Sequence, residues 1–466
     1  MTPEAAFATL SEQFRKHPHS SIAHRLERLR ALRRVLIARQ EDVRQALWND
    51  FNKPRYEVDL TEIAATMFEV THAIRHLRKW TKPVRKKTPL YLIGTSTDVV
   101  FQPKGPSLII TPWNYAFLLT IGPVVHATAA GCPFVVKPSE NTPNASKLLK
   151  EIIESVFPRE EAMVFEGDAS VANAFLELPF SHIHFTGSVG VGKVVMAAGS
   201  KHLSSVTLEL GGKSPVYVDE TADLGDAARG ICFGKFSNAG QTCIAPDYVL
   251  VKEDVKTQLV EEIERHIKQF YGASAADRKT SNYARIINGR HFDRLALLLK
   301  ESVDAGARVL FGGEVDPQSR YIEPTLLDDV PQGLPLLREE IFGPLLPLIA
   351  VASEEAAIAE IKSRPPPLSV YLYSSKKGLA EHFSTQIRTG AICANTTLLQ
   401  FIQPFGPFGG EGNSGIGRSH GEAGFRAFCN EQVILKRRWG AFILQLFHPP
   451  YSPRSTFFMN VLRRLG

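Results

Sequence analysis

Cys243 follows a Gly-Gln-Thr turn, and this setting suits a reactive thiol. The segment 236–243 reads FSNAGQTC, so a helix-like run ends in small residues directly before the sulfur. Small neighbours leave room for a substrate, and a thiolate is a strong nucleophile where hydrogen-bond donors or positive potential stabilise it. Taken alone, such a cysteine is more often a small buried apolar residue. Cys243 is therefore a candidate nucleophile that needs partners elsewhere in the chain.

Two polar residues that each follow an apolar run are candidates for those partners. Glu209 ends the run Val206–Leu208 and precedes Gly211-Gly212, a place where a half-buried carboxylate can act as a general base. Asn114 lies in Thr111–Tyr115, just after Leu108–Ile110, and its amide can donate to an oxyanion. An acid at a strand end and an asparagine in a loop are each, alone, more often ordinary turn residues.

A third group of residues suits a dinucleotide. Lys137 and Glu140 follow the run Phe134–Val136, where a lysine can reach a ribose or phosphate and a carboxylate can accept ribose hydroxyls. The turn 187–193 (GSVGVGK) follows His182–Phe185 directly, so backbone N–H groups and a helix N-terminus are expected near a pyrophosphate. Because its spacing is not GxGxxG, this turn is a weak signal by itself.

The elements that must position these residues alternate between strand and helix patterns. Residues 3–50 and 56–80 have apolar residues at helical spacing, 82–89 is a basic, proline-punctuated linker, and 97–102 suits a strand. Short apolar runs then alternate with helix-like stretches, which predicts parallel strands with crossover helices in two α/β units. The runs are 108–110, 134–136, 163–165, 182–185, 206–208, 216–218, 248–251, 308–311 and 345–350. The Gly- and Pro-rich segment 401–424 is expected to be loop.

Together these pieces resemble the aldehyde dehydrogenase superfamily. The matching motifs run in family order and are PWN (112–114), KPSE (137–140), FTGSVGVG (185–192), LELGGKSP (208–215), GQTC (240–243), EEIFGP (339–344) and PFGGEGNSGIG (407–417). RKWTKPVRKKTPL (78–90), the short N-terminus and HPPYS (448–452) are most similar to the class 3 branch, which includes fatty- and aromatic-aldehyde enzymes and whose members are typically dimers.

The resemblance implies a role for each matched residue. It makes Cys243 the nucleophile, Glu209 the base that activates the deacylating water, and Asn114 the side-chain half of an oxyanion hole completed by the Cys243 N–H. It places the cofactor against Pro112, Trp113, Lys137, Glu140, Gly187, Ser188, Gly192, Glu340 and Phe342. The implied cofactor is NAD, since Glu140 would repel a 2′-phosphate, with NADP also accepted in the class 3 branch. No metal is expected.

The implied fold is α/β, with a Rossmann-like NAD(P)-binding domain, an α/β catalytic domain and a small β element for bridging and oligomerisation. The expected boundaries are 1–82 with 104–210 for cofactor binding, 211–395 for catalysis, 83–103 with 396–430 for bridging, and 431–466 for a C-terminal tail. The chain's 466 residues are enough for two or three domains.

The net charge of +6 is concentrated in that tail. After Glu431 there is no acidic residue, and the six basic ones are Lys436, Arg437, Arg438, Arg454, Arg463 and Arg464. A basic, apolar tail on a neutral body indicates binding to an anionic membrane surface rather than to nucleic acid. A solvated arm that packs on the protein itself is equally consistent with this composition. The apolar stretches Trp439–Phe447 and Phe457–Leu465 would also suit gating of the substrate tunnel, and a lipophilic, medium- or long-chain aldehyde.

Composition narrows the setting of the protein. Five cysteines without regular spacing argue against a disulfide framework and for a reducing compartment. We find no signal-peptide pattern and no run of about 18 apolar residues, so a cytoplasmic protein with peripheral membrane contact is expected. Two other functions stay open: a CoA-acylating dehydrogenase, whose relatives typically lack the base at the position of Glu209, and a non-catalytic scaffold, against which the complete set of Cys243, Glu209 and Asn114 argues.

Overall fold

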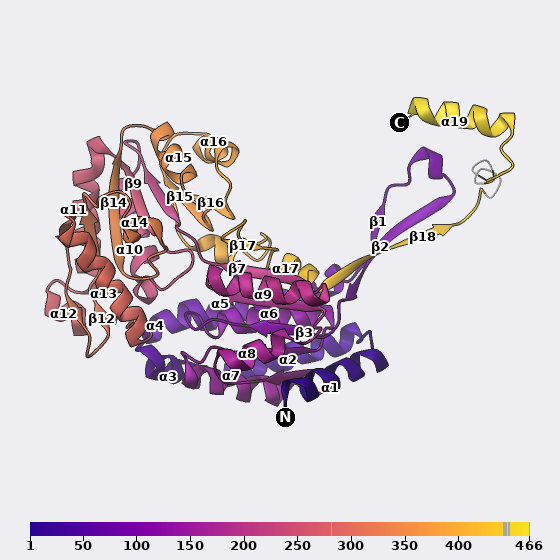
Figure 1. Cartoon of the computed structure of the whole chain (residues 1–466), viewed down its shortest axis with the longest axis horizontal. Coiled ribbons are helices and arrows are strands. Elements are labelled where there is room, and N and C mark those ends of the chain that lie inside the picture. The colour runs from indigo at the N-terminus through magenta and orange to yellow at the C-terminus, as the bar shows by residue number, and fades with distance from the viewer. Residues whose placement is uncertain (281, 441–444, 446–447, 466) are drawn as a thin grey trace.

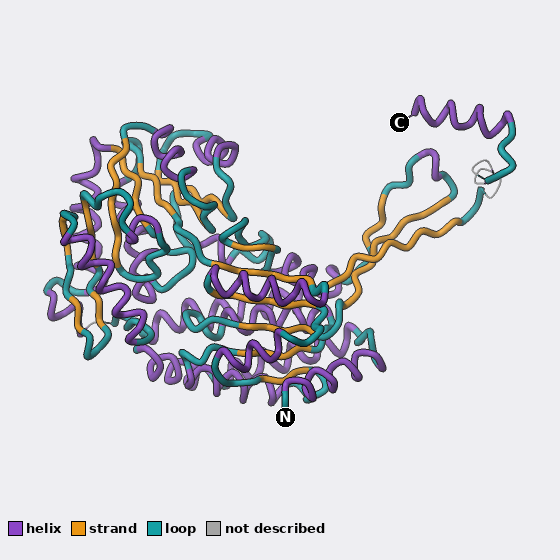
Figure 2. Tube along the Cα trace, in the orientation of Figure 1, coloured by secondary structure: helices purple, strands orange, loops and turns teal. Residues whose placement is uncertain are grey.

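The computed structural model describes residues 1–280, 282–440, 445 and 448–465. Its body contains two large sheets, each accompanied by helices, and a narrow arm projects from the body (Figure 1). The alternating strands and helices are visible along the trace in Figure 2. The α/β class predicted from the sequence is confirmed.

The N-terminal residues form helices, as their spacing predicts. Thr2 and Ser21 cap the first two helices, since their hydroxyls accept from Ala5 N and His24 N. Glu62 lies in a six-residue π-helical segment, and such segments occur frequently at functional sites. The elements are α1 (Pro3–Lys16), α2 (Ile22–Ala38), α3 (Gln40–Phe51), α4 (Arg55–Val58), the π-segment η1 (Asp59–Ala64) and α5 (Ala65–Trp80).

A six-stranded sheet follows, with the order β17-β7-β6-β3-β4-β5. All neighbours pair in parallel except β17, which runs antiparallel to β7. Ile109 packs in one core with Ile121, whereas Leu108 and Ile110 pack with Phe185 in another, so the sheet is buried on both faces. The strands are β3 (Ser107–Ile110), β4 (Phe134–Lys137), β5 (Ala162–Val164), β6 (His182–Gly187), β7 (Ser205–Leu210) and β17 (Gly415–Ile416).

Helices cover both faces of this sheet. Those that contact its strands or flank them are α6 (Leu118–Ala130), α7 (Pro143–Val156), α8 (Ala169–Leu176) and α9 (Val189–His202). Two of them matter for the site: α6 begins directly after the loop that carries Asn114, and α9 begins directly after Ser188.

A seven-stranded sheet forms the other half of the body, with the order β10-β13-β14-β9-β8-β15-β16. Its strands are β8 (Pro215–Val218), β9 (Tyr248–Lys252), β10 (Arg308–Phe311), β13 (Thr325–Asp328), β14 (Leu345–Val351), β15 (Ser369–Tyr373) and β16 (Ala391–Ala394). The accompanying elements are α10 (Leu224–Phe236), η3 (Ser237–Gly240), α11 (Glu253–Tyr271), α12 (Ala275–Thr280), α13 (Gly289–Asp304), α14 (Pro335–Arg338), α15 (Glu354–Lys362), α16 (Leu379–Gln386), and the hairpin β11 (Val315–Asp316) and β12 (Tyr321–Ile322).

The sequence prediction for this half is incomplete. It missed β13, β15 and β16, and it took 308–311 for a parallel strand, whereas β10 pairs antiparallel with β13 at the sheet edge. Strands of four or five residues carry little periodicity of their own, and they are identified by the neighbours with which they pair.

The arm is a three-stranded sheet in the order β1-β2-β18. Its strands are β1 (Val84–Lys86), β2 (Thr95–Pro103) and β18 (Cys429–Arg437), with the short turn η2 (Leu90–Leu92) between the first two. The predicted linker 82–89 therefore contains a strand, which its basic, exposed residues do not reveal. The expected boundary at residue 431 falls inside β18.

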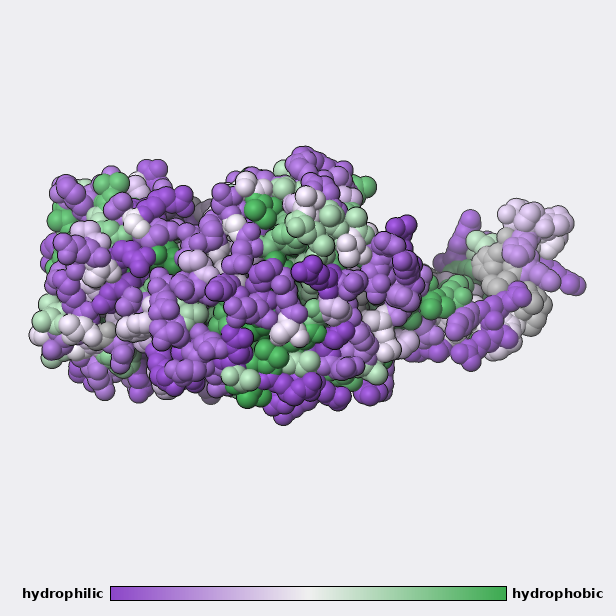
Figure 3. Space-filling model, turned by 90° about the horizontal axis from the view of Figure 1, so that it is seen from below, coloured by the Kyte–Doolittle hydropathy of each residue, from purple (hydrophilic) through white to green (hydrophobic). Residues whose placement is uncertain are grey.

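Beyond the arm, the chain forms α19 (Pro453–Leu465). Much of the apolar stretch predicted at 439–447 lies outside the described residues. Apolar side chains are visible on the arm in Figure 3. Among the described residues, no helix is both long and apolar enough to cross a membrane.

The segment 401–424, predicted to be loop, contains regular structure. It includes β17 and the start of α17 (Gly421–Ala427), and it begins within the turn η4 (Leu399–Ile402). Gly415 of β17 pairs with Glu209 of β7, so the final part of the chain joins the first sheet at its edge. The glycines concealed this pairing, because they weaken a strand pattern.

A fully buried ion pair ties the N-terminal helices to the site. Lys53 Nζ lies 3.0 Å from Glu62 Oε1, and both side chains are 0% exposed. The other oxygen of Glu62 accepts from the backbone N–H groups of Phe117 and Leu118 at the start of α6. Because one carboxylate holds both the ammonium and the helix start, losing the ammonium would leave a buried charge uncompensated.

We expect Lys53→Met to lower the free energy of unfolding by about 3–5 kcal/mol, the usual result of removing one partner of a buried ion pair. Urea denaturation followed by circular dichroism measures it. The matched control is Lys16→Met, whose pair with Glu12 is exposed, with a change within about 0.5 kcal/mol. Equal changes in the two variants would contradict this account of Lys53.

Candidate active site

Nine of the twelve predicted site residues line one pocket, which we call the inter-sheet pocket. They are Pro112, Trp113, Asn114, Gly187, Ser188, Glu209, Cys243, Glu340 and Phe342. Strands β3, β6 and β7 supply several of them just past their carboxyl ends, where ligands commonly bind in open α/β sheets. The other three, Lys137, Glu140 and Gly192, lie on neighbouring elements.

The loop that presents Cys243 has an unusual backbone. Asn238 and Ala239 adopt φ of 55° and 52°, the left-handed region, which costs free energy for residues other than glycine. Asn238 is fully buried, and its Nδ2 donates to Asn114 O and Gln241 O. At Gly240, with φ of 72°, a Cβ would lie 2.3 Å from Gly343 O, so only glycine fits there. The loop is therefore held rigidly around the sulfur.

Asn114 is tied to the same loop. Its Nδ2 donates to Gln241 O at 3.0 Å, and the side chain is 3% exposed. The hydroxyl of the next residue, Tyr115, and Thr242 Oγ1 share a hydrogen bond of 2.7 Å. These two bonds fix the amide beside the nucleophile loop, and an amide held in this way can stabilise developing negative charge.

The surroundings of Cys243 strongly disfavour ionisation of its thiol. Burial, followed by the nearby carboxylates of Glu340 and Glu209, raises the pKa of Cys243 to about 12. The backbone N–H groups of Cys243 and Ile244 act in the opposite direction. Two acidic neighbours make this thiol dependent on positive charge brought into the pocket.

Glu209 lies at the end of β7 and is 7% exposed. Burial raises its pKa to about 8, against the hydrogen bond from Ser419 and the charge of Arg418. Its Oε1 accepts from Ser419 Oγ at 2.9 Å, whereas its Oε2 has no hydrogen-bond partner among the described residues. A buried carboxyl with one free oxygen and a pKa close to neutral is suited to general-base work.

The turn at 187–192 leads from β6 into α9. Ser188 is the N-cap of this 14-residue helix, and Gly187 and Ser188 place the helix N-terminus at the inter-sheet pocket. Such an end offers free N–H groups to a phosphate. Gly192 lies one turn further along, where a Cβ would come within 2.7 Å of the Leu210 side chain, so this glycine lets α9 pack closely on β7.

Lys137 and Glu140 form an ion pair of 2.8 Å at the end of β4. Lys137 is 3% exposed, whereas the Glu140 side chain is 46% exposed and so faces solvent beyond the strand ends. Because β4 neighbours β3 in the sheet, the pair lies at the edge that carries the pocket.

Glu340 and Phe342 close the pocket from the second half of the body. A Cβ at Gly211 would lie 2.1 Å from Glu340 Oε2, so the carboxylate occupies space that only glycine leaves free. Burial and the charge of Asp247 raise the pKa of Glu340 to about 8. Phe342 has a backbone φ of 49°. Its ring packs edge-on against that of Trp113, with the ring centroids 5.5 Å apart. A helix N-terminus, a carboxylate and apolar rings together form a cradle that fits a dinucleotide.

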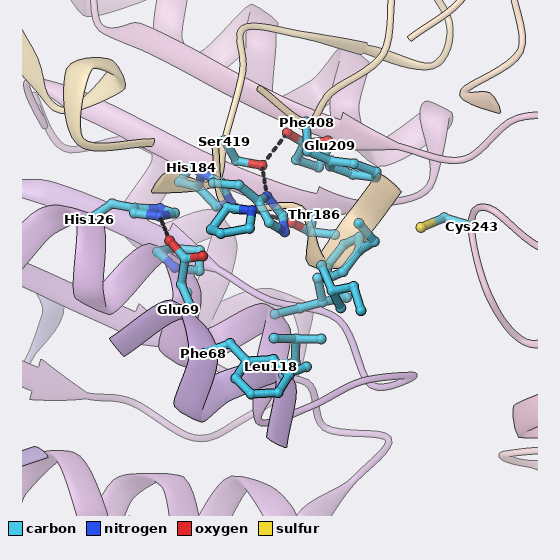
Figure 4. A pocket seen from close by; sticks show the side chains of 18 of the residues that line it. Phe68, Glu69, Leu118, His126, His184, Thr186, Glu209, Cys243, Phe408 and Ser419 are labelled. Carbon is cyan, nitrogen blue, oxygen red and sulfur yellow. Dashed lines mark hydrogen bonds and ion pairs between the residues drawn. The ribbon is translucent and has the colours of Figure 1, made fainter. Parts of the chain in front are cut away.

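Cys243 also borders two further cavities. The first, the apolar pocket, is lined by Leu60, Thr61, Ala65, Phe68, Tyr115, Leu118, Leu119, Phe233, Thr242, Cys243, Ile244, Leu398, Leu399, Phe401 and Ile402. The second, the inner chamber, shares several of these residues and reaches Glu209 (Figure 4). In that view Glu209 and Ser419 lie on one side, Phe68 and Leu118 on the opposite side, and Cys243 at the edge.

Comparison with known proteins agrees with this geometry. Residues 2–434 match the model of the aldehyde dehydrogenase family. The chain belongs to the aldehyde dehydrogenase family. The resemblance predicted from the sequence is thus confirmed, and the match covers both sheets and most of the arm.

Among its relatives in the family is 4,4'-diaponeurosporen-aldehyde dehydrogenase of Staphylococcus aureus, 42% identical over 91% of each chain. The dimeric, NADP-preferring aldehyde dehydrogenase of Rattus norvegicus is 38% identical over 91% of this chain and 92% of its own. A solved structure described as the substrate-bound state of Staphylococcus aureus AldH has a TM-score of 0.93 at 39% identity, covering 98% of this chain and 99% of that one.

Several site residues of this family member escaped sequence reasoning. Ser419 lies 210 positions from Glu209 in a segment without periodicity, so no local signal connects the two. Gly211 was visible beside Glu209, but its contact with Glu340 requires knowing how the two sheets meet. His291 and Arg294 of α13 also line the inter-sheet pocket.

We expect Glu340→Gln to speed alkylation of Cys243 by iodoacetamide in the cofactor-free protein by about tenfold, because removing one negative neighbour lowers the thiol pKa and each unit multiplies the thiolate tenfold. The measurement is made at pH 9.5, above the pKa of about 8 at Glu340, where its charge is fully present in the parent protein. The exposed neighbour Glu339 gives the control, Glu339→Gln, with an unchanged rate. A slower or equal rate in Glu340→Gln would show that its charge does not act on the sulfur.

Proposed function

We propose that this protein oxidises an aldehyde to the carboxylic acid with NAD(P) as oxidant. The observation that carries the proposal is the position of Cys243, which lies where the inter-sheet pocket and the apolar pocket meet. An aldehyde entering from the apolar side reaches the sulfur opposite the cradle for the dinucleotide. Membership of the aldehyde dehydrogenase family supports the same chemistry.

The first step is addition of the Cys243 sulfur to the aldehyde carbon, which forms a C–S bond and an oxyanion. Asn114 Nδ2 and the backbone N–H of Cys243 hold the oxyanion; losing one such donor typically costs about 100–1000-fold in rate. When bound, the nicotinamide would supply the positive charge that the Cys243 thiol lacks and would accept the hydride that the adduct carbon loses as the adduct becomes a thioester. Gly187, Ser188, Glu340 and Phe342 are the residues that would hold it.

The second step releases the product from the thioester on Cys243. Glu209 takes a proton from a water molecule through its free Oε2, the hydroxide adds to the thioester carbon, and the C–S bond breaks as the thiolate leaves. With a pKa of about 8, Glu209 is ionised in a growing fraction of molecules as the pH rises. The rate of deacylation is therefore expected to rise tenfold per pH unit below pH 8 and to level off above it.

NAD is the proposed cofactor, with NADP also accepted. The Glu140 carboxylate at the strand ends would repel a 2′-phosphate. Its pair with Lys137 reduces that repulsion, and the relative from Rattus norvegicus is named as NADP-preferring.

The proposed substrate is a lipophilic aldehyde, of medium or long chain if aliphatic. Nearly all side chains that line the apolar pocket are aliphatic or aromatic, and several of them, such as Leu60, Phe68 and Leu399, are also exposed at the surface. The relative from Staphylococcus aureus is named for the aldehyde of a diaponeurosporene.

We further propose a homodimer and a tail that contacts membranes or gates the tunnel. The arm leaves both outer strands of its sheet without a partner among the described residues, and an open edge favours pairing with another chain. The rat relative is named as dimeric.

On α19, Phe457 is 71% exposed beside exposed arginines, which suits binding to an anionic membrane surface in a reducing compartment such as the cytoplasm.

Two other functions are weaker. A CoA-acylating dehydrogenase would release the thioester by thiolysis, and the buried Glu209 with its free oxygen favours hydrolysis instead. A non-catalytic scaffold would have no need for the complete set of Cys243, Glu209 and Asn114. Production of NADH from a long-chain aldehyde without CoA separates the three.

We expect Glu209→Gln to produce about one NADH per active site and then almost no turnover, because the thioester forms but is not hydrolysed. Stopped-flow absorbance measures the NADH, and mass spectrometry of the intact protein detects the acyl group on Cys243. In the companion variant Cys243→Ser, the oxidation should be lost while cofactor binding is kept. Unchanged steady-state turnover in Glu209→Gln would exclude this residue as the base.

We expect truncation after Ser452, which removes α19 and keeps β18 complete, to weaken binding to phosphatidylserine-containing liposomes and to shift the preferred aldehyde chain length. Sedimentation with liposomes and kcat/KM for aldehydes of 6 to about 16 carbons are the measurements. Liposomes of phosphatidylcholine alone are the control for charge. If neither property changed, the role proposed for α19 would be withdrawn.

A further inference from the structure

The pocket around Glu209 poses a problem of proton transfer. Each turnover leaves on this carboxyl a proton that came from water, and the proton must depart before the next turnover. Glu209 is 7% exposed, and apolar side chains such as Phe408 and Leu368 form much of the inner chamber beside it. A route of polar groups is needed from this carboxyl outward.

The two oxygens of Glu209 have different surroundings. Oε2 has no hydrogen-bond partner among the described residues and is free for the reacting water. Oε1 accepts from Ser419 Oγ at 2.9 Å, and the same Oγ lies 2.9 Å from His420 Nδ1 (Figure 4). A hydroxyl between a carboxyl and an imidazole can pass a proton in either direction, because it donates to one group while accepting from the other.

His420 has a strained backbone conformation. Its φ of 69° and that of 48° at Gly421 are left-handed, and strain of this kind in a non-glycine residue indicates a functional constraint. Phe401 and Phe408 contact the imidazole, with ring centroids 4.4 and 5.0 Å away. The backbone N–H of Gly421 donates to Glu69 Oε1 at 2.9 Å, so a buried carboxylate anchors the turn.

The charges around His420 come from several elements. Although burial acts to raise it, the pKa of Glu69 on α5 is lowered to about 2 by the hydrogen bond and charge of His126 on α6. Burial lowers the pKa of His420 to about 4, with Glu69 acting to raise it and His126 to lower it. His184 on β6 lies near both histidines, and Arg418 lies near Glu209. His420 is thus neutral at pH 7 and able to accept a proton beside an ionised carboxylate.

We propose that Ser419 and His420 form the route by which the proton taken up by Glu209 is carried away from this carboxyl. This inference rests on the function proposed above. The protonated carboxyl of Glu209 first turns so that the oxygen carrying the proton faces Ser419. Its O–H bond then breaks as the proton passes to Ser419 Oγ, while the Ser419 proton passes to His420 Nδ1. Glu209 is again a carboxylate that accepts from Ser419. The imidazolium, with Glu69 as its counter-charge, loses a proton from Nε2 to water in the inner chamber, which His420 also lines.

Both residues act through Glu209 and are positioning residues for the base. The pKa of Glu209, about 8, is higher than that of His420, about 4. The proton is therefore bound to Glu209 most of the time and to His420 only briefly. Loss of the route therefore slows the recovery of Glu209 and leaves formation of the thioester untouched.

The test separates the first turnover from later ones. In His420→Asn the side chain can still hydrogen-bond Ser419 but cannot carry a proton. We expect NADH formation in the first turnover at a rate within about twofold of the parent, followed by steady-state turnover slower by about 10- to 100-fold, within the usual contribution of acid–base groups. Ser419→Ala is expected to behave alike, and Ser419→Thr, which keeps a hydroxyl, to restore turnover.

A second buried serine–histidine pair supplies the control. His182 Nδ1 lies 2.8 Å from Ser205 Oγ on β6 and β7, without contact to Glu209. Turnover in His182→Asn and Ser205→Ala is expected to stay within about twofold. Unchanged steady-state turnover in His420→Asn and Ser419→Ala would overturn the route, and so would an equal loss in the first turnover, which would reveal a purely structural role. Failure of the parent protein to form NADH from any aldehyde would instead overturn the proposed function.

Discussion

Three acidic groups share one pocket in this protein, and burial works against the ionisation of each. The carboxyls of Glu209 and Glu340 both have pKa values raised to about 8, and the thiol of Cys243 has a pKa of about 12. A second negative charge among them is costly, because each would raise the free energy of the others in a medium of low dielectric. The state of ionisation therefore depends on the charge that enters the pocket, and a cation favours the thiolate.

The scaffold around this pocket is arranged to keep it rigid. Left-handed residues at Asn238 and Ala239 and the close approach at Gly240 leave the nucleophile loop one conformation. The buried pair of Lys53 and Glu62 holds the opposite wall, since it fixes the start of α6 next to Asn114. Preorganisation of this kind lets donors meet a developing charge without first being rearranged.

Much of this was predictable from the sequence, and the remainder has a common physical cause. Asn114, Lys137, Glu209 and the turn at 187–193 were singled out by a local signal, an apolar run followed by a polar residue or glycine, which is weak by itself. Pro112, Trp113, Glu340 and Phe342 were predicted only from the family resemblance. Ser419, His420, Gly211 and β17 were missed, because their roles come from contacts between segments that are remote in sequence. In the arm, a strand was predicted at 97–102, within β2, whereas β1 was taken for linker and most of β18 for tail. The reason is the same, because β1 and β18 are exposed strands that are defined only by pairing with β2.

The pairing of β2 with β18 also orders events during synthesis. Thr95–Pro103 pairs along its whole length with Cys429–Arg437, so more than three hundred residues separate the partners in the chain. Both sheets of the body can close around their cores while β2 still waits for its neighbour, and contacts of such long sequence separation form late. The arm is thus the last sheet of the fold to be completed. Until β18 arrives, the edge of β2 that it will cover stays open to pairing with other chains.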